Sequence, residues 1–301
     1  MLARTVVILG FCFVILYPII NMMTRALMLP RDLYDNSVLW VPRNFSLANV
    51  KLAARAINYW GAFSNSLWSS SLVTLLQLFS CLTAGYAFGR YKLPFRRVLF
   101  ALVILTLIIP PQLIMVPSYL NFRYFDIFGI YSLITGTPGI PMLDTSMPMI
   151  LLALTGNGIR NGLFIFLFRQ FFVSVPKEIE EAAMVDGAGH FRTFFKIMLP
   201  QTTTITVTVA LFSFVWQWND KFYTSLYNRL FETLPNAVTL MRPDLFAANI
   251  PEYVGFSLAD PVIGRNLSGT AVLLAEIPLI LLFLFLQRYF VTSVERSGVV
   301  G

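Results

Sequence analysis

The side chains that most often carry out catalysis are scarce in this sequence. His190 is the only histidine, and the two cysteines, Cys12 and Cys81, lie in separate apolar runs. A single histidine excludes mechanisms that need two imidazoles, and the cysteines indicate neither a disulfide framework nor a metal site. The phosphate-binding pattern G-x-x-x-x-G-K-[ST] is absent, because no Gly-Lys dipeptide occurs. We therefore expect no catalytic residue, no metal and no cofactor in this chain.

Polar side chains inside strongly apolar stretches are better candidates, because a polar group that faces lipid is costly. At about 100° per residue, one face of the stretch 202–227 would carry Thr202, Thr206, Ala210, Ser213, Gln217 and Asp220. This face either lines a water-filled path or packs its hydroxyl groups against neighbouring helices. The segment Trp216-Gln217-Trp218-Asn219-Asp220 mixes aromatic faces with polar groups, which suits sugar binding and equally an aromatic belt at a membrane surface.

A second polar group lies in the stretch 147–172, where Asn157, Arg160 and Asn161 share one arc of a helix. An arginine at this depth is expected to face the interior of a helix bundle or to lie near the outer surface, with Asp220 as a candidate partner. Glu276, close to Pro278, suits a substrate-path or proton role, or a hydrogen bond to backbone freed by the proline. The candidate substrate path therefore comprises Asn157, Arg160, Asn161, Ser213, Trp216, Gln217, Asn219 and Asp220.

The composition indicates that these stretches lie in a membrane. Of the 301 residues, 57% are hydrophobic and 12% are charged, with a mean hydropathy of +0.71, whereas a soluble domain carries about 25% charged residues. An aromatic content of 15% excludes a disordered chain, and a soluble enzyme of this composition would expose large apolar patches. A bilayer needs roughly 20 apolar residues per helix. The expected fold is an all-α polytopic membrane protein with six transmembrane helices, at about 5–24, 66–89, 98–122, 147–172, 202–227 and 268–291.

Prolines and glycines modify these helices. Pro110-Pro111 and Pro117 should interrupt the third stretch and Pro278 the sixth, while the pairs Gly85/Gly89 and Gly158/Gly162 have the spacing of close helix packing. The first stretch is expected to be retained, because it ends without the small-residue cleavage site of a signal peptide.

The distribution of Lys and Arg predicts the orientation. Residues 90–97 carry four positive charges and no acid, and 169–200 and the C-terminal tail add further basic residues on the same side. Both termini are therefore expected in the cytoplasm, with the loops 25–65, 123–146 and 228–267 outside.

The segment 174–200 is expected to form a helix–turn–helix elbow outside the bilayer. Ser174 is the expected N-cap, Pro176 suits the first turn, and the acids at 178, 180 and 181 complement the helix dipole. Gly187 and Gly189 should end this helix, and a second helix should run to Pro200. We expect Ala182, Ala183 and Ala188 to be buried and Phe191, Phe194 and Phe195 to be exposed. Such a surface suits docking into another protein's groove, although charged connectors are often simply solvated.

Part of this segment follows a fixed spacing. Glu181-Ala182-Ala183, three residues, Gly187, nine residues, Ile197, one residue and Leu199-Pro200 occur without a gap, and Asp186-Gly187-Ala188 fits the same pattern. The segment resembles the EAA loop of ABC-importer permeases. The resemblance extends beyond this segment, to the six apolar stretches, the pattern Trp216-x-Trp218-Asn219-Asp220 and the tail from Gln287 to Gly301. Over nearly its full length the chain is similar to the second permease subunit of maltose-type sugar importers.

The resemblance implies a type I ABC-importer permease fold, with 1–301 as a single permease domain in a bacterial inner membrane. It implies that 174–200 is the coupling helix, which docks on an ATPase and in which Glu181 pairs with a basic residue of that subunit. The ATPase-coupling residues would be Glu181, Ala182, Ala183, Asp186, Gly187, Ala188, Ile197, Leu199 and Pro200. The implied partners are a second homologous permease, an ABC ATPase dimer that binds ATP and Mg, and a solute-binding protein contacted from outside by the loop 229–267. The tail up to Gly301 would reach the ATPase dimer interface, and the implied substrate is a sugar or oligosaccharide.

Other classes explain less of the sequence. A secondary transporter with Glu276 as its proton site would account for the broken helices but not for the elbow pattern, and the six stretches show no obvious internal repeat. A channel lacks a filter motif, and a membrane hydrolase lacks a nucleophile paired with a base.

Overall fold

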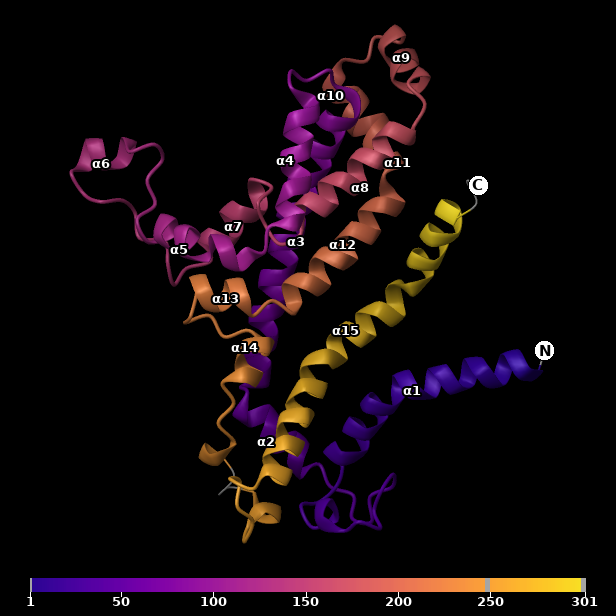
Figure 1. The fold of residues 1–301 in the computed structure, drawn as a ribbon, viewed down its shortest axis with the longest axis vertical. Coiled ribbons are helices and arrows are strands. Elements are labelled where there is room, and N and C mark those ends of the chain that lie inside the picture. Colours follow the sequence, from indigo (N-terminus) through magenta and orange to yellow (C-terminus); the bar gives the residue numbers. More distant parts are fainter. Residues whose placement is uncertain (1, 247–249, 299–301) are drawn as a thin grey trace. The chain divides into compact units, whose positions relative to one another are not determined.

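The computed structural model describes residues 2–246 and 250–298, and its ordered elements are helical (Figure 1). Within these ranges the only β pairing consists of two isolated bridges, Met28–Phe45 and Phe125–Ile140. The all-α expectation is therefore confirmed. The chain divides into two units, residues 1–66 with 232–283 and residues 67–231 with 284–301. Residues 247–249 of the expected external loop and the end of the tail at Gly301 lie outside the described residues.

The first unit contains α1 (Leu2–Ala26), α2 (Ala48–Ala56), the start of α3 (Tyr59–Arg90), α14 (Leu234–Thr239) and most of α15 (Pro261–Gly298). The range 229–267 is largely structured, since it holds α14, the 3₁₀ turns Pro243–Leu245 and Pro251–Tyr253, and the first turns of α15. Leu52 of α2 packs with Tyr253 and with Ile263 of α15 in a small core. Asn49 is fully buried beside this core, where its amide donates to the Met28 carbonyl at 2.6 Å and accepts from the Tyr253 hydroxyl.

The second unit contains the rest of α3 and the helices that carry the candidate residues. In chain order these are α4 (Arg96–Ile108), a 3₁₀ turn (Pro111–Ile114), α5 (Met115–Arg123), α6 (Ile130–Thr135), α7 (Met147–Leu154), α8 (Asn161–Ser174), α9 (Glu178–Val185), α10 (His190–Thr193), a π-helical turn (Phe194–Met198), α11 (Leu199–Gln201), α12 (Thr203–Trp218) and α13 (Phe222–Tyr227).

The core of the second unit forms where α3 and α8 pack closely together. At two positions of α3, Gly85 and Gly89, the contact leaves no room for a side chain. A Cβ atom at Gly85 would lie 2.4 Å from the Cβ of Phe168, and one at Gly89 would lie 2.8 Å from the Cβ of Phe172. Both phenylalanines are fully buried. The predicted packing role of the Gly85/Gly89 pair is confirmed. Gly162 has the same role on α8, because a Cβ there would lie 2.8 Å from the Val103 carbonyl of α4.

Three helices are long and apolar enough to cross a membrane: Ala3–Ala26, Tyr59–Arg90 and Pro261–Gln287. Two bent pairs could each add a span, which gives up to five within the described residues. Arg96–Ile108 and Pro111–Arg123 meet at 102°, and His190–Gln201 and Thr203–Trp218 meet at 75°. The break expected at Pro110-Pro111 is thus confirmed, whereas six spans remain a prediction.

The structure corrects four expectations about helix continuity. The stretch 147–172 is two helices, α7 and α8, separated by residues 155–160. The stretch 202–227 is also divided, because α12 ends at Trp218 and α13 begins at Phe222. Pro117 lies in the first turn of α5, where its missing N–H is not needed. Pro278 does not interrupt α15, since packing in a long apolar helix tolerates the loss of one backbone hydrogen bond.

Candidate functional site

A cavity of about 640 Å³ opens in the second unit where broken helices come together. Its walls come from the end of α4 with Pro110-Pro111, from the loop between α7 and α8, and from α13. Three of the predicted path residues, Asn157, Arg160 and Asn161, line it together with Tyr223 and Tyr227; the described lining contains no Asp or Glu. The cavity can therefore offer amide, phenol and guanidinium groups to a polar solute, against walls that are otherwise mostly apolar.

A buried hydrogen-bond network joins this cavity to α12. The Ser213 hydroxyl donates to Gln77 Oε1 at 2.5 Å, and Gln77 Nε2 donates to Asn161 Oδ1 at 2.5 Å and to the Ile159 carbonyl at 3.0 Å. Ser213 also lies 3.2 Å from the Thr74 hydroxyl. Of the two interpretations of the α12 stripe, Ser213 therefore fits packing of hydroxyls between helices. The Asn161 Nδ2 and Gln217 Nε2 atoms are buried and have no hydrogen-bond partner within the described chain.

Arg160 lies at the start of α8 in a left-handed backbone conformation, with φ of 59°. Its guanidinium carbon lies 5.6 Å from the ring centroid of Trp216, so a cation–π contact links it to α12. The Trp216 ring in turn stacks on Phe164 and Phe212, with centroids 5.6 and 5.7 Å away. Arg160 and Trp216 are thus brought together.

Asp220 does not form an ion pair with Arg160 in the described part of the chain. Its carboxylate instead accepts hydrogen bonds from the Tyr223 and Thr224 N–H groups, at 3.1 and 2.9 Å, and from the Thr224 hydroxyl. Asp220 therefore caps α13, a role that requires the helix break which the sequence did not reveal. Asn219 is exposed, and its amide donates to the Val215 carbonyl.

The polar face of α3 is not among the candidates predicted from the sequence. Ser70, Thr74 and Gln77 recur at helical spacing and are all buried. Ser80, one turn further, donates to the Ala153 carbonyl of α7 at 2.7 Å. The periodic polar positions in 66–89 were the available signal, although serine and threonine also occur in helices that merely pack.

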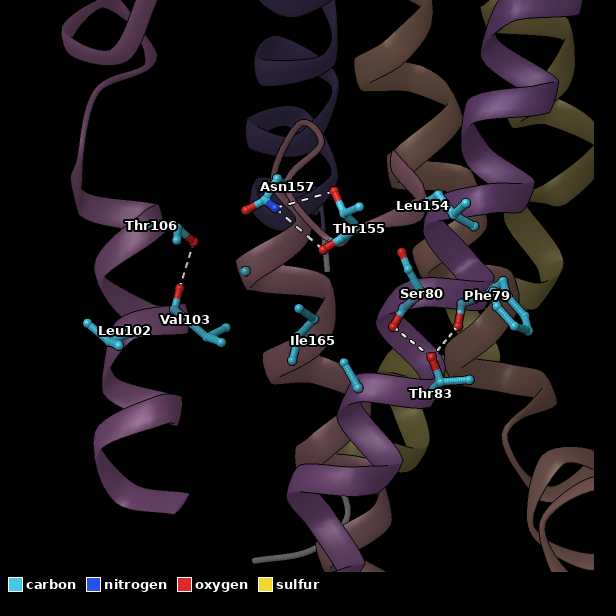
Figure 2. Close-up of a pocket in the computed structure, with 13 residues that line it drawn as sticks. Phe79, Ser80, Thr83, Leu102, Val103, Thr106, Leu154, Thr155, Asn157 and Ile165 are labelled. Atoms are coloured by element: carbon cyan, nitrogen blue, oxygen red, sulfur yellow. Dashed lines mark hydrogen bonds between the residues drawn. The ribbon is translucent and has the colours of Figure 1, made fainter. Parts of the chain in front are cut away.

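A second cavity of about 360 Å³ adjoins Ser80 between α3, α4 and the α7–α8 loop (Figure 2). Its threonine hydroxyl groups are already satisfied by their own helices. Thr106 donates to the Val103 carbonyl at 2.7 Å, and Thr83 donates to the Phe79 carbonyl at 2.8 Å (Figure 2). This cavity is therefore less suited to bind a polar ligand than the larger one.

The elbow forms as two helical segments with a sharp turn. Gly187 has φ of +79°, its N–H donates to the Met184 carbonyl at 3.0 Å, and the Ala188 N–H donates to the Ala183 carbonyl at 2.9 Å. This is a Schellman ending, which requires a residue that tolerates the left-handed region. The predicted stop of the first helix at Gly187 is confirmed.

Several details of the elbow differ from expectation. Ser174 ends α8, where its hydroxyl donates to the Phe171 carbonyl, so it does not cap α9. The second helical segment continues through Pro200 to Gln201, directly after a π-helical turn at Phe194–Met198.

The burial pattern of the elbow is also only partly as expected. Ala182 is exposed and Phe194 is buried, with 8% of its surface exposed, because α9 and the segment that follows it each turn only one face toward the bundle. Ala183 is buried as expected. The outer surface carries Val185 and Phe191, which are 87% and 84% exposed, together with Met184 and Phe195.

Glu276 is half-buried in the continuous helix α15. No group of three or more His, Cys, Asp or Glu side chains able to hold a metal ion occurs among the described residues.

Comparison with known proteins places this geometry in a family. Residues 81–296 match the family model described as the binding-protein-dependent transport system inner membrane component. The chain is 26% identical over 303 residues to the arabinooligosaccharides transport system permease protein AraQ of Halalkalibacterium halodurans, covering 97% of this chain and 95% of the relative. It is 28% identical over 270 residues to the melibiose/raffinose/stachyose import permease protein MelC of Bacillus subtilis, covering 89% and 86%.

The fold is also similar to a solved structure. A chain in the crystal structure of a bacterial ABC transporter involved in the import of the acidic polysaccharide alginate matches with a TM-score of 0.72 and 21% identity, covering 96% of this chain and 95% of the other. The family match includes the elbow and the lining of the larger cavity. The chain therefore belongs to the family of binding-protein-dependent transport system inner membrane components, as a multi-pass inner-membrane permease subunit that is not an enzyme and is energised by a separate ATPase.

Proposed function

We propose that this chain is a permease subunit of an ATP-driven importer for a sugar or oligosaccharide, and that the elbow couples it to the ATPase. The observation that carries the proposal is the elbow itself, a Schellman-terminated helix with an exposed apolar surface, formed by residues that follow the EAA spacing. The sugar class is supported by the relatives, which are described as permeases for arabino-oligosaccharides and for melibiose, raffinose and stachyose.

The proposed architecture has a single permease domain over 1–301 with six transmembrane helices in the type I arrangement. Both termini lie in the cytoplasm, and a second, homologous permease completes the path. α7 and α8 together form the fourth span, because the 14 residues of α8 rise only about 21 Å at 1.5 Å per residue. A bilayer core of about 30 Å needs more than that. The range 229–267 faces outward, toward the solute-binding protein.

The coupling residues form one end of the second unit. Glu181 is exposed on α9 and available to a basic residue of the ATPase, while Met184, Val185 and Phe191 supply an apolar surface for its cleft. Ala182, Ala183, Asp186, Gly187 and Ala188 fix the shape of the turn, and Ile197, Leu199 and Pro200 continue the second helical segment toward α12. Closure of the ATPase dimer on ATP moves this elbow, and the two permeases tilt to open the path outward.

The proposed path runs along the 640 Å³ cavity. Asn157, Arg160 and Asn161 line it, Ser213 holds Asn161 through Gln77, and the buried Gln217 Nε2 atom has no hydrogen-bond partner within the described chain. Trp216 contributes indirectly, because its ring contacts the guanidinium of Arg160, which lines the cavity. Asn219 lies at the exposed end of α12, and Asp220 contributes indirectly by holding α13, whose Tyr223 and Tyr227 form one wall of the cavity.

The elbow proposal is tested on the complete transporter in proteoliposomes. Glu181→Lys replaces the acid offered to the ATPase, and Gly187→Pro cannot adopt the φ of +79° that the turn requires. Both variants should insert normally but lose ATP hydrolysis stimulated by the loaded binding protein. Glu178→Lys, an exposed acid three residues before Glu181 on the same helix, is the matched control and should retain stimulation. Stimulation that survives both Glu181→Lys and Gly187→Pro would show that the elbow is not the coupling element.

A further inference from the structure

Arg90, the last residue of α3, holds the elbow through a buried ion pair. Its Nε atom lies 3.4 Å from Glu180 Oε1 on α9, and the two side chains are 5% and 12% exposed. A second guanidinium nitrogen donates to the Val175 carbonyl, in the connection from α8 to α9, at 2.7 Å. Arg90 therefore contacts both the beginning of the elbow and its first helix.

This contact is not a solvated surface pair. Neither Arg90 Nε nor Glu180 Oε1 has a hydrogen-bond partner within the described chain, while the Tyr86 hydroxyl also interacts with the Glu180 carboxylate. Breaking a buried pair by removing one partner is strongly destabilising, because an uncompensated charge stays behind. Glu178 and Glu181, by contrast, are exposed on the same helix.

The last turns of α3 also contact the second helical segment of the elbow. The Tyr86 ring, one turn before Arg90, lies 4.7 Å from the Phe194 ring and 5.0 Å from the Phe172 ring of α8, measured between centroids. The Tyr91 ring lies 6.2 Å from the His190 ring. The end of α3 thus touches both halves of the elbow, and Arg90 supplies the only ion pair found there among the described residues.

We propose that Arg90 is a positioning residue for coupling: its ion pair with Glu180 fastens the elbow to α3, so that movement of the elbow is passed to that helix. This inference rests on the proposed function, in which closure of the ATPase dimer moves the elbow. The polar face of α3, with Gln77 in the network beside the cavity, then gives the movement a direct route to the proposed path. Glu180 acts within the permease, while its neighbour Glu181 faces the ATPase.

The test is a double-mutant cycle in the complete transporter, with Arg90→Gln, Glu180→Gln and the double variant. Each single variant should co-purify with the ATPase but lose at least about tenfold of the stimulated ATP hydrolysis, because one charge is left unpaired. The double variant should be no worse than the worse single variant, and Arg90→Lys should recover part of the activity. Arg97→Gln and Glu178→Gln, which change exposed residues of the same two types, are the controls and should behave as the original protein.

A distance measurement distinguishes a loosened elbow from poor assembly of the variant transporter. Spin labels at Lys92 and Lys177, both exposed, in a background without Cys12 and Cys81 should give one narrow distance distribution, and Arg90→Gln should broaden it. Full stimulation in Arg90→Gln, multiplied losses in the double variant, or an unchanged distribution would overturn the inference. If Glu181→Lys abolishes stimulation while Arg90→Gln does not, only this inference fails; if neither matters, the proposed function of the elbow fails as well.

Discussion

At the scale of single residues, the two glycines of the elbow have different roles although they are two positions apart. Gly187 has φ of +79° and Gly189 has φ of −70°, and a Cβ atom at either position would meet no other atom within 4 Å. The room for a side chain is therefore the same at both positions, and the two glycines differ only in backbone conformation. Left-handed backbone costs a residue with a Cβ atom about 1 kcal/mol or more.

Gly187→Ala should consequently weaken the turn, whereas Gly189→Ala should not. A loss of about 1 kcal/mol corresponds to a roughly fivefold shift in a local opening equilibrium. Hydrogen exchange at the Ala188 amide, which donates to the Ala183 carbonyl, should therefore be about fivefold faster in Gly187→Ala and unchanged in Gly189→Ala. Equal exchange rates in the two variants would contradict the assignment of the Schellman ending to Gly187.

The positions of some functional side chains could be predicted from the sequence better than the residues with which they interact. Asn157, Arg160 and Asn161 were expected on one face, and they do line one cavity. The candidate partner of Arg160 was Asp220, because opposite charges inside a membrane usually pair. Arg160 instead lies against the Trp216 ring, and Asp220 caps α13. Hydrogen bonds from nearby backbone N–H groups can satisfy a carboxylate as well as a distant arginine can. A sequence pattern does not distinguish these two arrangements.

At the scale of helices, the contact between α3 and α8 depends on the absence of side chains at Gly85 and Gly89. A Cβ atom at Gly85 would lie 2.4 Å from the Phe168 Cβ and 3.0 Å from the Arg169 backbone nitrogen, neither of which is the end of a flexible side chain. The two helices must therefore separate to accommodate alanine. Overpacking of this kind typically costs about 1–3 kcal/mol.

Gly85→Ala should lower the thermal midpoint of the purified permease complex, although alanine favours helices over glycine by about 1 kcal/mol. Gly269→Ala is the matched control, because Gly269 lies inside α15 and a Cβ atom added there would meet no other atom within 4 Å. It should leave the midpoint unchanged or raise it. A Gly85→Ala variant as stable as Gly269→Ala would show that α3 and α8 are not in close contact.

Helix existence could be predicted from the sequence, but within the apolar stretches helix breaks could be predicted only where proline marks them. The break at Pro110-Pro111 was expected on that basis. The breaks at 155–160 and 219–221 were not, because the surrounding stretches are apolar and contain no proline at those points. Conversely, Pro278 marked no break, since the decision between a kink and a continuous helix depends on packing around the proline. These missed breaks shape the larger cavity.

At the scale of the whole molecule, the distribution of charge predicts which loops lie on each side of the membrane. The first helix is long enough to span and is exposed along its length, as expected for a helix in lipid. The short helices α7 and α8 make the fourth span the least certain part of the proposed six-helix topology. If they failed to cross together, the elbow and the basic loop 90–97 would lie on opposite sides of the membrane.

Cysteine labelling decides this point. With Cys12 and Cys81 replaced, single cysteines are placed at Ser37, Thr137 and Glu252 on the expected outer side, and at Ala3, Phe95, Lys177 and Ser297 on the expected inner side. A membrane-impermeant maleimide should label the first group in intact cells and the second group only after permeabilisation, because the basic segments stay in the cytoplasm. Labelling of Lys177 from outside, with Phe95 still protected, would show that the stretch 147–172 does not cross, and would separate the elbow from a cytoplasmic ATPase.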